Sequence, residues 1–457
     1  MNVGGYAVVG GGISGLTAAY RLRAALGADA RIVLFDPAEQ LGGVLRTVEV
    51  AGRAMDVGAE AFVRRRPEVP ALLAELGLGD RVRDTTGVRP LVYSGAGLHP
   101  MPTGTLNGIP SSAQALSGLV DTATVARIDA EPDRALHWRR GADPTVAELV
   151  GERFGEQVVT RSVDPLLAGV YAGSANTIGL RAAAPGLAAA LDRGAPSLLA
   201  AVRSALPAPT GAPIFGALTG GYRVLVDELT RRARPERVRT AVSRLRRSGP
   251  GWELTGADGT AHRADAVILA VPPHRQAELL GEAAPRAAAL AARIPAASSA
   301  VVALALPAGT PIPEHSGVLV ASGERLHAKA ITLSSRKWGV DAAGPELLRV
   351  SFGRFGDGGR TVEAGDDELL AWAREDLATV LGVEADPADS AVARFVDAMP
   401  QYGPGHGELV ADLRADLPAT LAVAGSFLDG IGVPACIAAA TAAATRVLGA
   451  AAPTVAR

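Results

Sequence analysis

The chain has 457 residues and a formal net charge of −2. Its length exceeds the size at which one hydrophobic core usually stops growing, so more than one structural unit is expected. The nearly neutral charge argues against a nucleic-acid-binding protein, because phosphate contacts need a basic field. The single cysteine, Cys436, excludes an intrachain disulfide and favours the reducing cytoplasm. Residues Met1 to Gly5 lack a basic region, so no signal peptide is expected.

The first segment reads as strand, glycine turn, helix and strand, over residues 6–10, 12–26 and 31–36. The turn Gly10-Gly11-Gly12-Ile13-Ser14-Gly15 fits G-x-G-x-x-G, and Asp36 closes the second strand. In this motif the first glycine permits a tight turn, the second lets the backbone approach a pyrophosphate, and the third allows close helix–strand packing. The acidic residue accepts from a ribose hydroxyl. The segment is therefore predicted to bind a dinucleotide.

The rest of the chain changes from a helical to a strand-like pattern. Helices are predicted over 122–138, 145–154 and 186–206, within a helical insertion. Strands are predicted over 238–245, 252–255, 266–271, 297–306, 317–320, 328–333 and 347–352, followed by a helix over 366–381. The chain ends, as it began, with a strand over 421–424 and a helix over 434–448. This order predicts that the units are interleaved along the chain.

Three further segments indicate a flavin. Leu41 to Thr47, Met55 to Glu60 and Ala424 to Pro434 resemble, in this order, motifs of the FAD-binding superfamily that includes amine oxidases, porphyrinogen oxidases and phytoene desaturases. The resemblance implies one FAD per chain, with the helix that begins near Pro434 directing its positive end at the flavin. Cys436 follows the last motif, but buried cysteines usually pack as small apolar groups, so non-covalent binding is expected.

The motif and the resemblance together imply a set of cofactor-binding residues: Gly10, Gly11, Gly12, Ile13, Ser14, Gly15, Asp36, Gly42, Gly43, Gly58, Ala59, Glu60, Ala61, Val242, Phe395, Gly425, Gly430, Ile431, Gly432 and Val433. Related sequences often carry tryptophan where this chain has Phe395. That difference removes an indole donor but keeps an aromatic face.

Other segments resemble one branch of this superfamily. Arg161 to Gly173 resembles the segment that lines the porphyrinogen cavity in oxidases of haem synthesis, and Thr332 to Trp338 and Met399 to Tyr402 resemble bacterial members. The chain is identified as a member of the protoporphyrinogen/coproporphyrinogen III oxidase family. Its arginine-rich composition is similar to that of actinobacterial enzymes associated with coproporphyrinogen III. The resemblance implies oxidation of that substrate to coproporphyrin III by three hydride transfers, with oxygen as acceptor and hydrogen peroxide as product.

The implied substrate residues are a cavity wall and a set of side chains around it. Gly169 permits close approach and Val170 packs on a macrocycle, although both also fit an ordinary turn and core. Basic side chains are needed for propionates, but each one alone also fits a solvated surface charge. The substrate candidates are Arg46, Arg66, Gly169, Val170, Lys329 and Leu333. The histidines show no metal-ligand spacing, so no metal site is expected.

The predicted fold is α/β, with a Rossmann-type FAD-binding domain (1–80, 211–275 and 406–457), an α+β substrate domain (81–109 and 276–405) and a helical insertion (110–210). The expected partners are a porphyrinogen, oxygen and a ferrochelatase that receives the product, with membrane contact at most peripheral and no nucleic acid. Protoporphyrinogen IX oxidation, amine oxidation and a non-catalytic FAD protein remain alternatives. No lysine occurs in the strand 298–305, where amine oxidases typically hold one.

Overall fold

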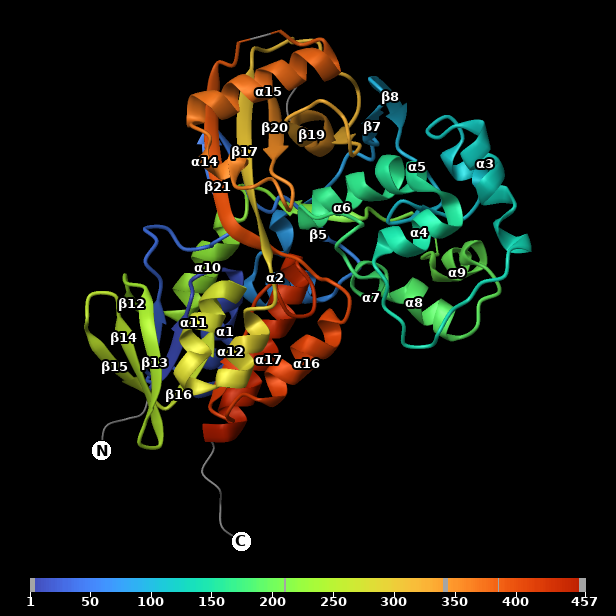
Figure 1. The fold of residues 1–457 in the computed structure, drawn as a ribbon. Helices are drawn as coiled ribbons and strands as arrows, with labels where there is room; N and C mark the ends of the chain where they lie inside the picture. The colour runs from blue at the N-terminus through green and yellow to red at the C-terminus, as the bar shows by residue number, and fades with distance from the viewer. Residues whose placement is uncertain (1–4, 209–210, 340–343, 385, 452–457) are drawn as a thin grey trace.

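The computed structural model describes residues 5–208, 211–339, 344–384 and 386–451. Residues 1–4 of the N-terminal segment therefore lie outside the described chain. Figure 1 shows a lower body that contains both ends of the described chain, an upper body built on a long sheet, and a lateral group of helices.

The lower body is built on a parallel sheet of five strands, in the order β12-β2-β1-β16-β22. Its strands are β12 (Glu236–Val238), β2 (Ile32–Phe35), β1 (Tyr6–Val9), β16 (Ala266–Leu269) and β22 (Leu421–Val423). Val8 of the central strand pairs with Leu34 on one side and Ile268 on the other. Because layers cover both faces, the strands β2, β1, β16 and β22 read as continuous apolar runs, whereas the edge strand β12 does not.

Helices cover one face of this sheet and a mixed layer covers the other. The first layer contains α1 (Ile13–Leu26), α2 (Glu68–Leu76), α10 (Arg223–Ala233) and α17 (Val433–Ala451). The second contains the antiparallel strands β13 (Val242–Ser248), β14 (Gly251–Gly256) and β15 (Ala261–Ala264), with α11 (Pro273–Ala283), α12 (Pro285–Ala291) and α16 (His406–Ala415). Val8 faces the first layer and Val9 the second, as strand alternation requires.

The upper body contains a seven-stranded sheet, in the order β21-β17-β20-β19-β18-β7-β8. Its strands are β21 (Asp389–Pro400), β17 (Ala296–Leu306), β20 (Glu346–Phe352), β19 (Ala328–Leu333), β18 (Gly317–Val320), β7 (Leu91–Ser94) and β8 (Gly97–Pro100). All neighbouring strands are antiparallel except β18 and β7. The helix α15 (Asp366–Leu381) covers one face, and the hairpin β3 (Thr47–Val50) with β4 (Arg53–Asp56) packs on the other.

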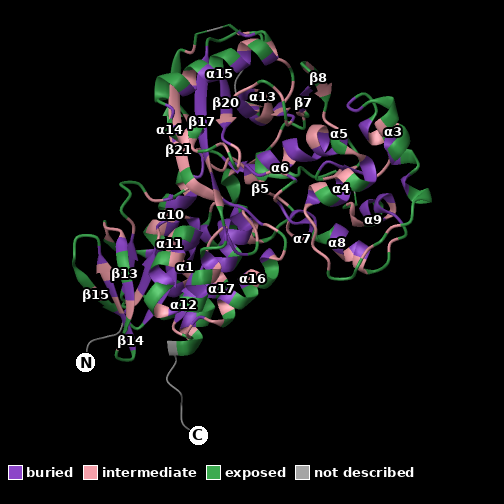
Figure 2. Cartoon of the chain, in the orientation of Figure 1, coloured by how far each residue is buried: buried purple, intermediate pink, exposed green. Residues whose placement is uncertain are grey.

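The lateral body is helical and has its own apolar core. Its longer elements are α3 (Thr122–Asp129), α4 (Val146–Phe154), the π-helical turn Val159–Val163, α6 (Asp164–Tyr171), α8 (Pro185–Asp192) and α9 (Leu198–Ala205). Arg153 and Glu131 form an ion pair of 2.6 Å inside this core, with 2% and 0% of their side chains exposed. Figure 2 shows buried residues inside each of the three bodies.

Several predicted elements differ in extent from the observed ones. The helix predicted over 122–138 ends at Asp129, since Pro132 follows in a short 3-10 turn. The helix predicted over 186–206 is two helices, separated at Gly194 and Pro196. No helix was predicted over 273–291, where α11 and α12 lie. The predicted domain boundary at 275/276 falls inside α11, whose apolar residues share the core of the parallel sheet.

Among the described residues, α17 is the one helix long and apolar enough to cross a membrane by length and composition. Its buried residues include Cys436, Ile437, Ala440 and Val447, which pack in the core that α1 also lines. This packing is that of a core helix.

Candidate cofactor site

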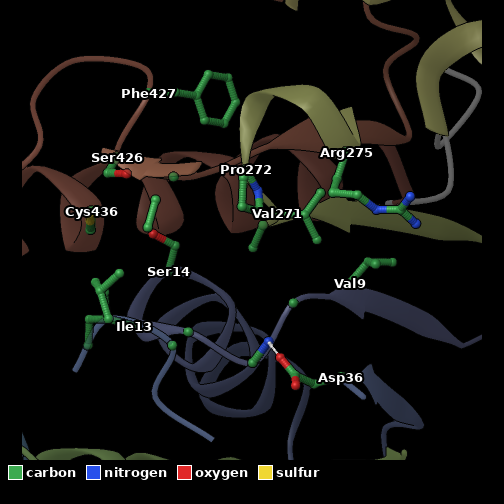
Figure 3. A pocket seen from close by; sticks show the side chains of 18 of the residues that line it. Val9, Ile13, Ser14, Asp36, Val271, Pro272, Arg275, Ser426, Phe427 and Cys436 are labelled. Atoms are coloured by element: carbon green, nitrogen blue, oxygen red, sulfur yellow. Dashed lines mark hydrogen bonds between the residues drawn. The ribbon is translucent and has the colours of Figure 1, made fainter. Parts of the chain in front are cut away.

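A pocket of about 340 Å³ lies at the carboxyl ends of the parallel strands, and we call it the glycine-turn pocket. Four segments far apart in sequence line it: residues 9–14, 35–44, 241–279 and 398–436. Crevices at this edge of a parallel sheet are where such folds bind their ligands. Figure 3 shows side chains from these segments around the pocket.

The glycines in the first turn allow the backbone to approach the pocket closely. Gly10 has φ of 104°, and a Cβ there would lie 2.3 Å from the carbonyl oxygen of Ala270. A Cβ on Gly15 would lie 1.8 Å from the Gly10 carbonyl oxygen, so α1 can approach β1 only with glycine at this position. A Cβ on Gly12 would have no neighbour closer than 3.9 Å, because Gly12 borders the open pocket.

The N-terminus of α1 is suited to bind an anion. Gly12 is its N-cap and provides no side-chain hydrogen bond, and the first turn contains no acidic residue. The free N–H groups and the helix dipole at such an end favour a phosphate group. These features fit the pyrophosphate of a dinucleotide.

Asp36 lies at the end of β2, where the motif predicts the ribose-binding acid. Its carboxylate accepts from the N–H of Gly11 at 2.6 Å (Figure 3), and also from the N–H of Ala38 at 2.8 Å. These bonds fix the carboxylate at the rim of the glycine-turn pocket. Each carboxylate oxygen accepts one of these two bonds and retains a lone pair that a ribose hydroxyl can use.

The second half of the pocket comes from the end of β16 and from the loop before α17. Val271 and Pro272 follow β16, and the guanidinium of Arg275 donates to the Val242 carbonyl oxygen at 2.9 Å. Cys436 reaches the pocket from α17 and lies beside Ser14 of α1 (Figure 3). Burial raises the pKa of this thiol to about 11, so it is a neutral thiol at physiological pH.

The loop that carries the last flavin motif, Ala424 to Pro434, is held by residues that follow the strand β21. The hydroxyl of Tyr402 donates to the Ser426 carbonyl oxygen, and its ring stacks on His406 with centroids 4.0 Å apart. His406 contacts the Leu428 carbonyl oxygen at 3.1 Å. The resemblance noted at Met399 to Tyr402 therefore corresponds to a set of contacts that position this loop.

The structure brings about half of the predicted cofactor residues into the glycine-turn pocket. The predicted residues that line it are Gly10, Gly11, Gly12, Ile13, Ser14, Asp36, Gly42, Gly43, Val242 and Gly425. The others lie near its walls or elsewhere. Gly15 packs inside α1, and Gly430, Ile431, Gly432 and Val433 lead into α17 without lining the pocket. Gly58 lies against the Phe395 ring, which a Cβ on Gly58 would approach to 3.2 Å.

Glu60 is engaged by the upper body instead of lining this pocket. Its carboxylate accepts from Lys337 at 2.6 Å, from the Trp338 indole at 3.0 Å and from the Ser334 hydroxyl at 3.2 Å. Burial alone would raise its pKa, but Lys337 and Arg349 reverse this effect and lower the pKa to about 2. The structure thus assigns Glu60 a structural contact between bodies, and the neighbouring Ala59 and Ala61 are half-buried.

The predicted substrate residues do not converge. Gly169 and Val170 lie on the exposed side of α6, with Val170 50% exposed, and a Cβ on Gly169 would lie 3.7 Å from Leu319 of the long sheet. Arg66 is exposed and pairs with Glu68 at 2.6 Å. Arg46 lines a different depression, together with Arg223, Arg231 and Arg237.

The structure does not support substrate contacts from Lys329 or Leu333. The Lys329 ammonium is buried and donates to the Ser299 hydroxyl at 2.9 Å and to the carbonyl oxygens of Phe352 and Gly353 at 3.0 and 2.8 Å. Three acceptors use all three of its N–H groups, so none remains for a propionate. Leu333 is fully buried in the core beneath α15, because alternation along β19 points it to that face.

Sequence reasoning missed the pocket residues contributed by long-range contacts, such as Val271, Pro272, Arg275, Ser426 and Phe427. One signal was available, since Val271 ends and Pro272 directly follows the strand predicted over 266–271, which pairs with β1 in the parallel sheet. The carboxyl end of such a strand adjoins the ligand crevice.

A comparison with protein families adds to this geometry. The family described as flavin containing amine oxidoreductase matches residues 13–448. The chain belongs to this family. The matched region includes the first turn of α1, the second glycine segment and the start of α17, all of which surround the glycine-turn pocket.

Relatives extend the match over nearly the whole chain. A protein named coproporphyrinogen III oxidase from Mycobacterium tuberculosis is 64% identical over 445 residues, covering 97% of this chain and 97% of its own. A protein with the same name from Bacillus subtilis is 28% identical and covers 94% and 95%. Human protoporphyrinogen oxidase is 32% identical and covers 97% and 98%.

Solved structures share the fold. A putative protoporphyrinogen oxidase from Exiguobacterium aligns with a TM-score of 0.87 and 27% identity, over 98% of this chain and 99% of the other. Cyclohexylamine oxidase from Brevibacterium oxydans aligns with a TM-score of 0.70 over 98% and 99%, at 15% identity. The second likeness concerns the fold alone.

Proposed function

We propose that this protein binds FAD non-covalently and oxidises coproporphyrinogen III to coproporphyrin III in haem biosynthesis, with oxygen as acceptor and hydrogen peroxide as product. The observation that carries the proposal is 64% identity to the mycobacterial coproporphyrinogen III oxidase over 97% of both chains. The flavin family match and the glycine-turn pocket support the same conclusion.

The residues of the glycine-turn pocket suit the parts of FAD. Gly10 to Ser14 would hold the pyrophosphate, Asp36 would accept from the adenosine ribose, and Val242 would border the adenine. When bound, a flavin supplies a two-electron hydride acceptor, so removal of six electrons from a porphyrinogen takes three rounds. The neutral Cys436 thiol favours non-covalent binding, because the thiolate is the nucleophilic form.

The protein's part in the reaction is positioning. A porphyrinogen needs an apolar surface for its macrocycle and basic groups for its propionates. The exposed face of α6, with Gly169 and Val170 opposite Leu319, supports a cavity wall between the helical body and the long sheet. Transfer of the product to a ferrochelatase and a cytoplasmic location, with at most peripheral membrane contact, complete the proposal.

The first test is turnover by the purified protein. Initial rates with coproporphyrinogen III and with protoporphyrinogen IX are followed by porphyrin fluorescence under air, against a control without enzyme. A clear preference for the four-propionate substrate is expected, with three molecules of peroxide formed per porphyrin. Preference for protoporphyrinogen IX would change the assigned substrate, and turnover of neither by a flavin-loaded protein would refute the proposal.

The cofactor is tested separately. Acid denaturation followed by chromatography of the supernatant should release FAD, with no flavin left on the precipitated protein. Recovery of FMN, or flavin retained on the protein, would contradict the proposed cofactor or its non-covalent attachment.

A further inference from the structure

A second pocket, of about 300 Å³, lies where the lower body meets the upper body, and we call it the arginine pocket. Its walls come from β4, from β6 (Val82–Asp84), from the turn at Gly220 and Gly221, and from α13 (Ser334–Trp338) with β20. It shares no lining residue with the glycine-turn pocket. The proposed reaction does not use it.

The two acids in this pocket have partners within the protein. Glu60 accepts from Lys337, Trp338 and Ser334, as described above. Asp56 accepts from the Thr47 hydroxyl at 2.5 Å and from the Tyr222 N–H at 2.9 Å. The turn at Gly221 can approach Asp56 this closely only with glycine, since a Cβ on Gly221 would lie 2.8 Å from an Asp56 oxygen. The hydrogen bonds of these carboxylates therefore join the walls of the pocket.

Arg83, in contrast, retains unused donors. The Nε atoms of Arg83 and Arg349 are buried and have no hydrogen-bond partner among the described residues. Arg349 is only 7% exposed, and its terminal nitrogens are engaged, one by Glu60 at 3.3 Å and the other by the Gly58 carbonyl oxygen at 2.8 Å. Arg83 lies over the Trp338 ring at 5.2 Å and forms no ion pair within the described chain. No hydrogen bond from the Arg83 side chain occurs within the described residues, and Arg83 lines the pocket, so its terminal nitrogens are available to an acceptor there.

The charge balance indicates which acceptor fits. Arg53, Arg83 and Arg349 line the arginine pocket. Lys337 does not line it but forms an ion pair with Glu60. The lining thus carries three guanidinium groups against the two carboxylates of Asp56 and Glu60, and Lys337 also pairs with Glu60, so positive charge is in excess. Guanidinium groups bind planar carboxylates through paired N–H donors, and the indole face supplies an apolar wall.

We infer that the arginine pocket is a binding site for a carboxylate, with Arg83 as its ligand. Two sources carry this chemistry: a propionate side chain of a porphyrin, or a free small carboxylate. Only the first source rests on the proposed function. The site itself follows from the unpartnered guanidinium of Arg83 and the charge of the pocket lining.

Binding is tested by isothermal titration calorimetry on the flavin-loaded protein, without turnover. The ligands are succinate, with neutral succinamide as its control, and coproporphyrin III, with its tetramethyl ester as its control. The variant Arg83→Gln removes the positive charge of this one side chain, and Arg83→Lys keeps that charge but loses the planar guanidinium. Arg81→Gln, two residues earlier and exposed, is the matched control. Melting temperature and flavin content establish that each variant is folded.

The expected result is carboxylate binding that weakens about tenfold or more in Arg83→Gln, less in Arg83→Lys, and not in Arg81→Gln. Succinate binding identifies a free carboxylate as the source. Arg83-dependent binding of coproporphyrin III, with no binding of succinate, identifies a propionate.

Two results would overturn the inference: succinate and succinamide that behave alike while coproporphyrin III binding ignores Arg83, or carboxylate binding that Arg83→Gln leaves unchanged. Either would mean that the pocket holds water only. Because oxidase rates are measured separately, loss of activity and loss of this site can be distinguished.

Discussion

Glu60→Gln tests whether Glu60 is a contact between bodies or a cofactor ligand. The carboxylate is 12% exposed, and its pKa falls from an ordinary 4.5 to about 2 because Lys337 and Arg349 outweigh the effect of burial. At about 1.4 kcal/mol per pH unit, this difference corresponds to about 3 kcal/mol of stability. A carboxylate with a lowered pKa stabilises the folded state above pH 4.5, and the contribution is lost as the pH falls towards 2.

Urea unfolding, followed by tryptophan fluorescence, measures this loss. At pH 7 the variant should lose about 3 kcal/mol of unfolding free energy. The difference from the unsubstituted protein should be constant down to about pH 5 and should shrink below pH 4.5. Glu68→Gln is the control, because Glu68 pairs with Arg66 at the surface. A loss below about 1 kcal/mol, combined with loss of bound flavin, would refute the structural role and favour a cofactor contact.

Three further outcomes follow from the same structure. Asp36→Asn should weaken FAD binding about tenfold in a fluorescence titration, since a charged acceptor is lost; Asp29→Asn, at an exposed turn, should not, and equal affinities would contradict the ribose assignment. Arg153→Met should lower the free energy of unfolding by about 3 kcal/mol or more, because it leaves Glu131 as a buried charge without its partner; an unchanged urea midpoint would argue against this. Cys436→Ala should keep the flavin content of the unsubstituted protein, and acid should release the flavin from both; loss of flavin from the variant alone would argue for a bond to sulfur.

The local parts of the fold could be predicted from sequence. The first strand, turn and helix were predicted closely, since an apolar run followed by closely spaced glycines leaves few conformations open. The helix Asp366–Leu381 was predicted with the bounds observed, because three acids begin it and Gly382 ends it in the left-handed region. The strand β21 was not predicted, because its residues are mostly half-buried and lack a clear alternation.

The candidate site could be predicted only where short motifs mark it. Lys329 illustrates the limit: one of two lysines in the chain, it suggested a propionate ligand, but the sheet directs its ammonium at three acceptors. Its partner Ser299 lies on β17, the strand in which no lysine occurs. Glu60 likewise lies beside a flavin motif, and its partners are about 275 residues away, at 334 to 338. Contacts over such separations depend on how the bodies pack, which single-sequence patterns do not encode.

The path of the chain explains why cofactor and substrate elements are linked. The chain enters the glycine-turn pocket at residues 9–14 and 35–44, returns at 241–279, and returns again at 398–436. The long sheet is formed mainly between the last two visits, and its edge strand β21 ends in the pocket at Pro400. Two residues later, Tyr402 bonds to the loop at Ser426. Because β21 carries Phe395 beside Gly58 and the residues directly after it place Tyr402 beside this loop, the edge of the long sheet and the flavin motif are positioned together. The interleaved order of the sequence is thus the means by which a sheet remote from the glycine turn helps to form the cofactor pocket.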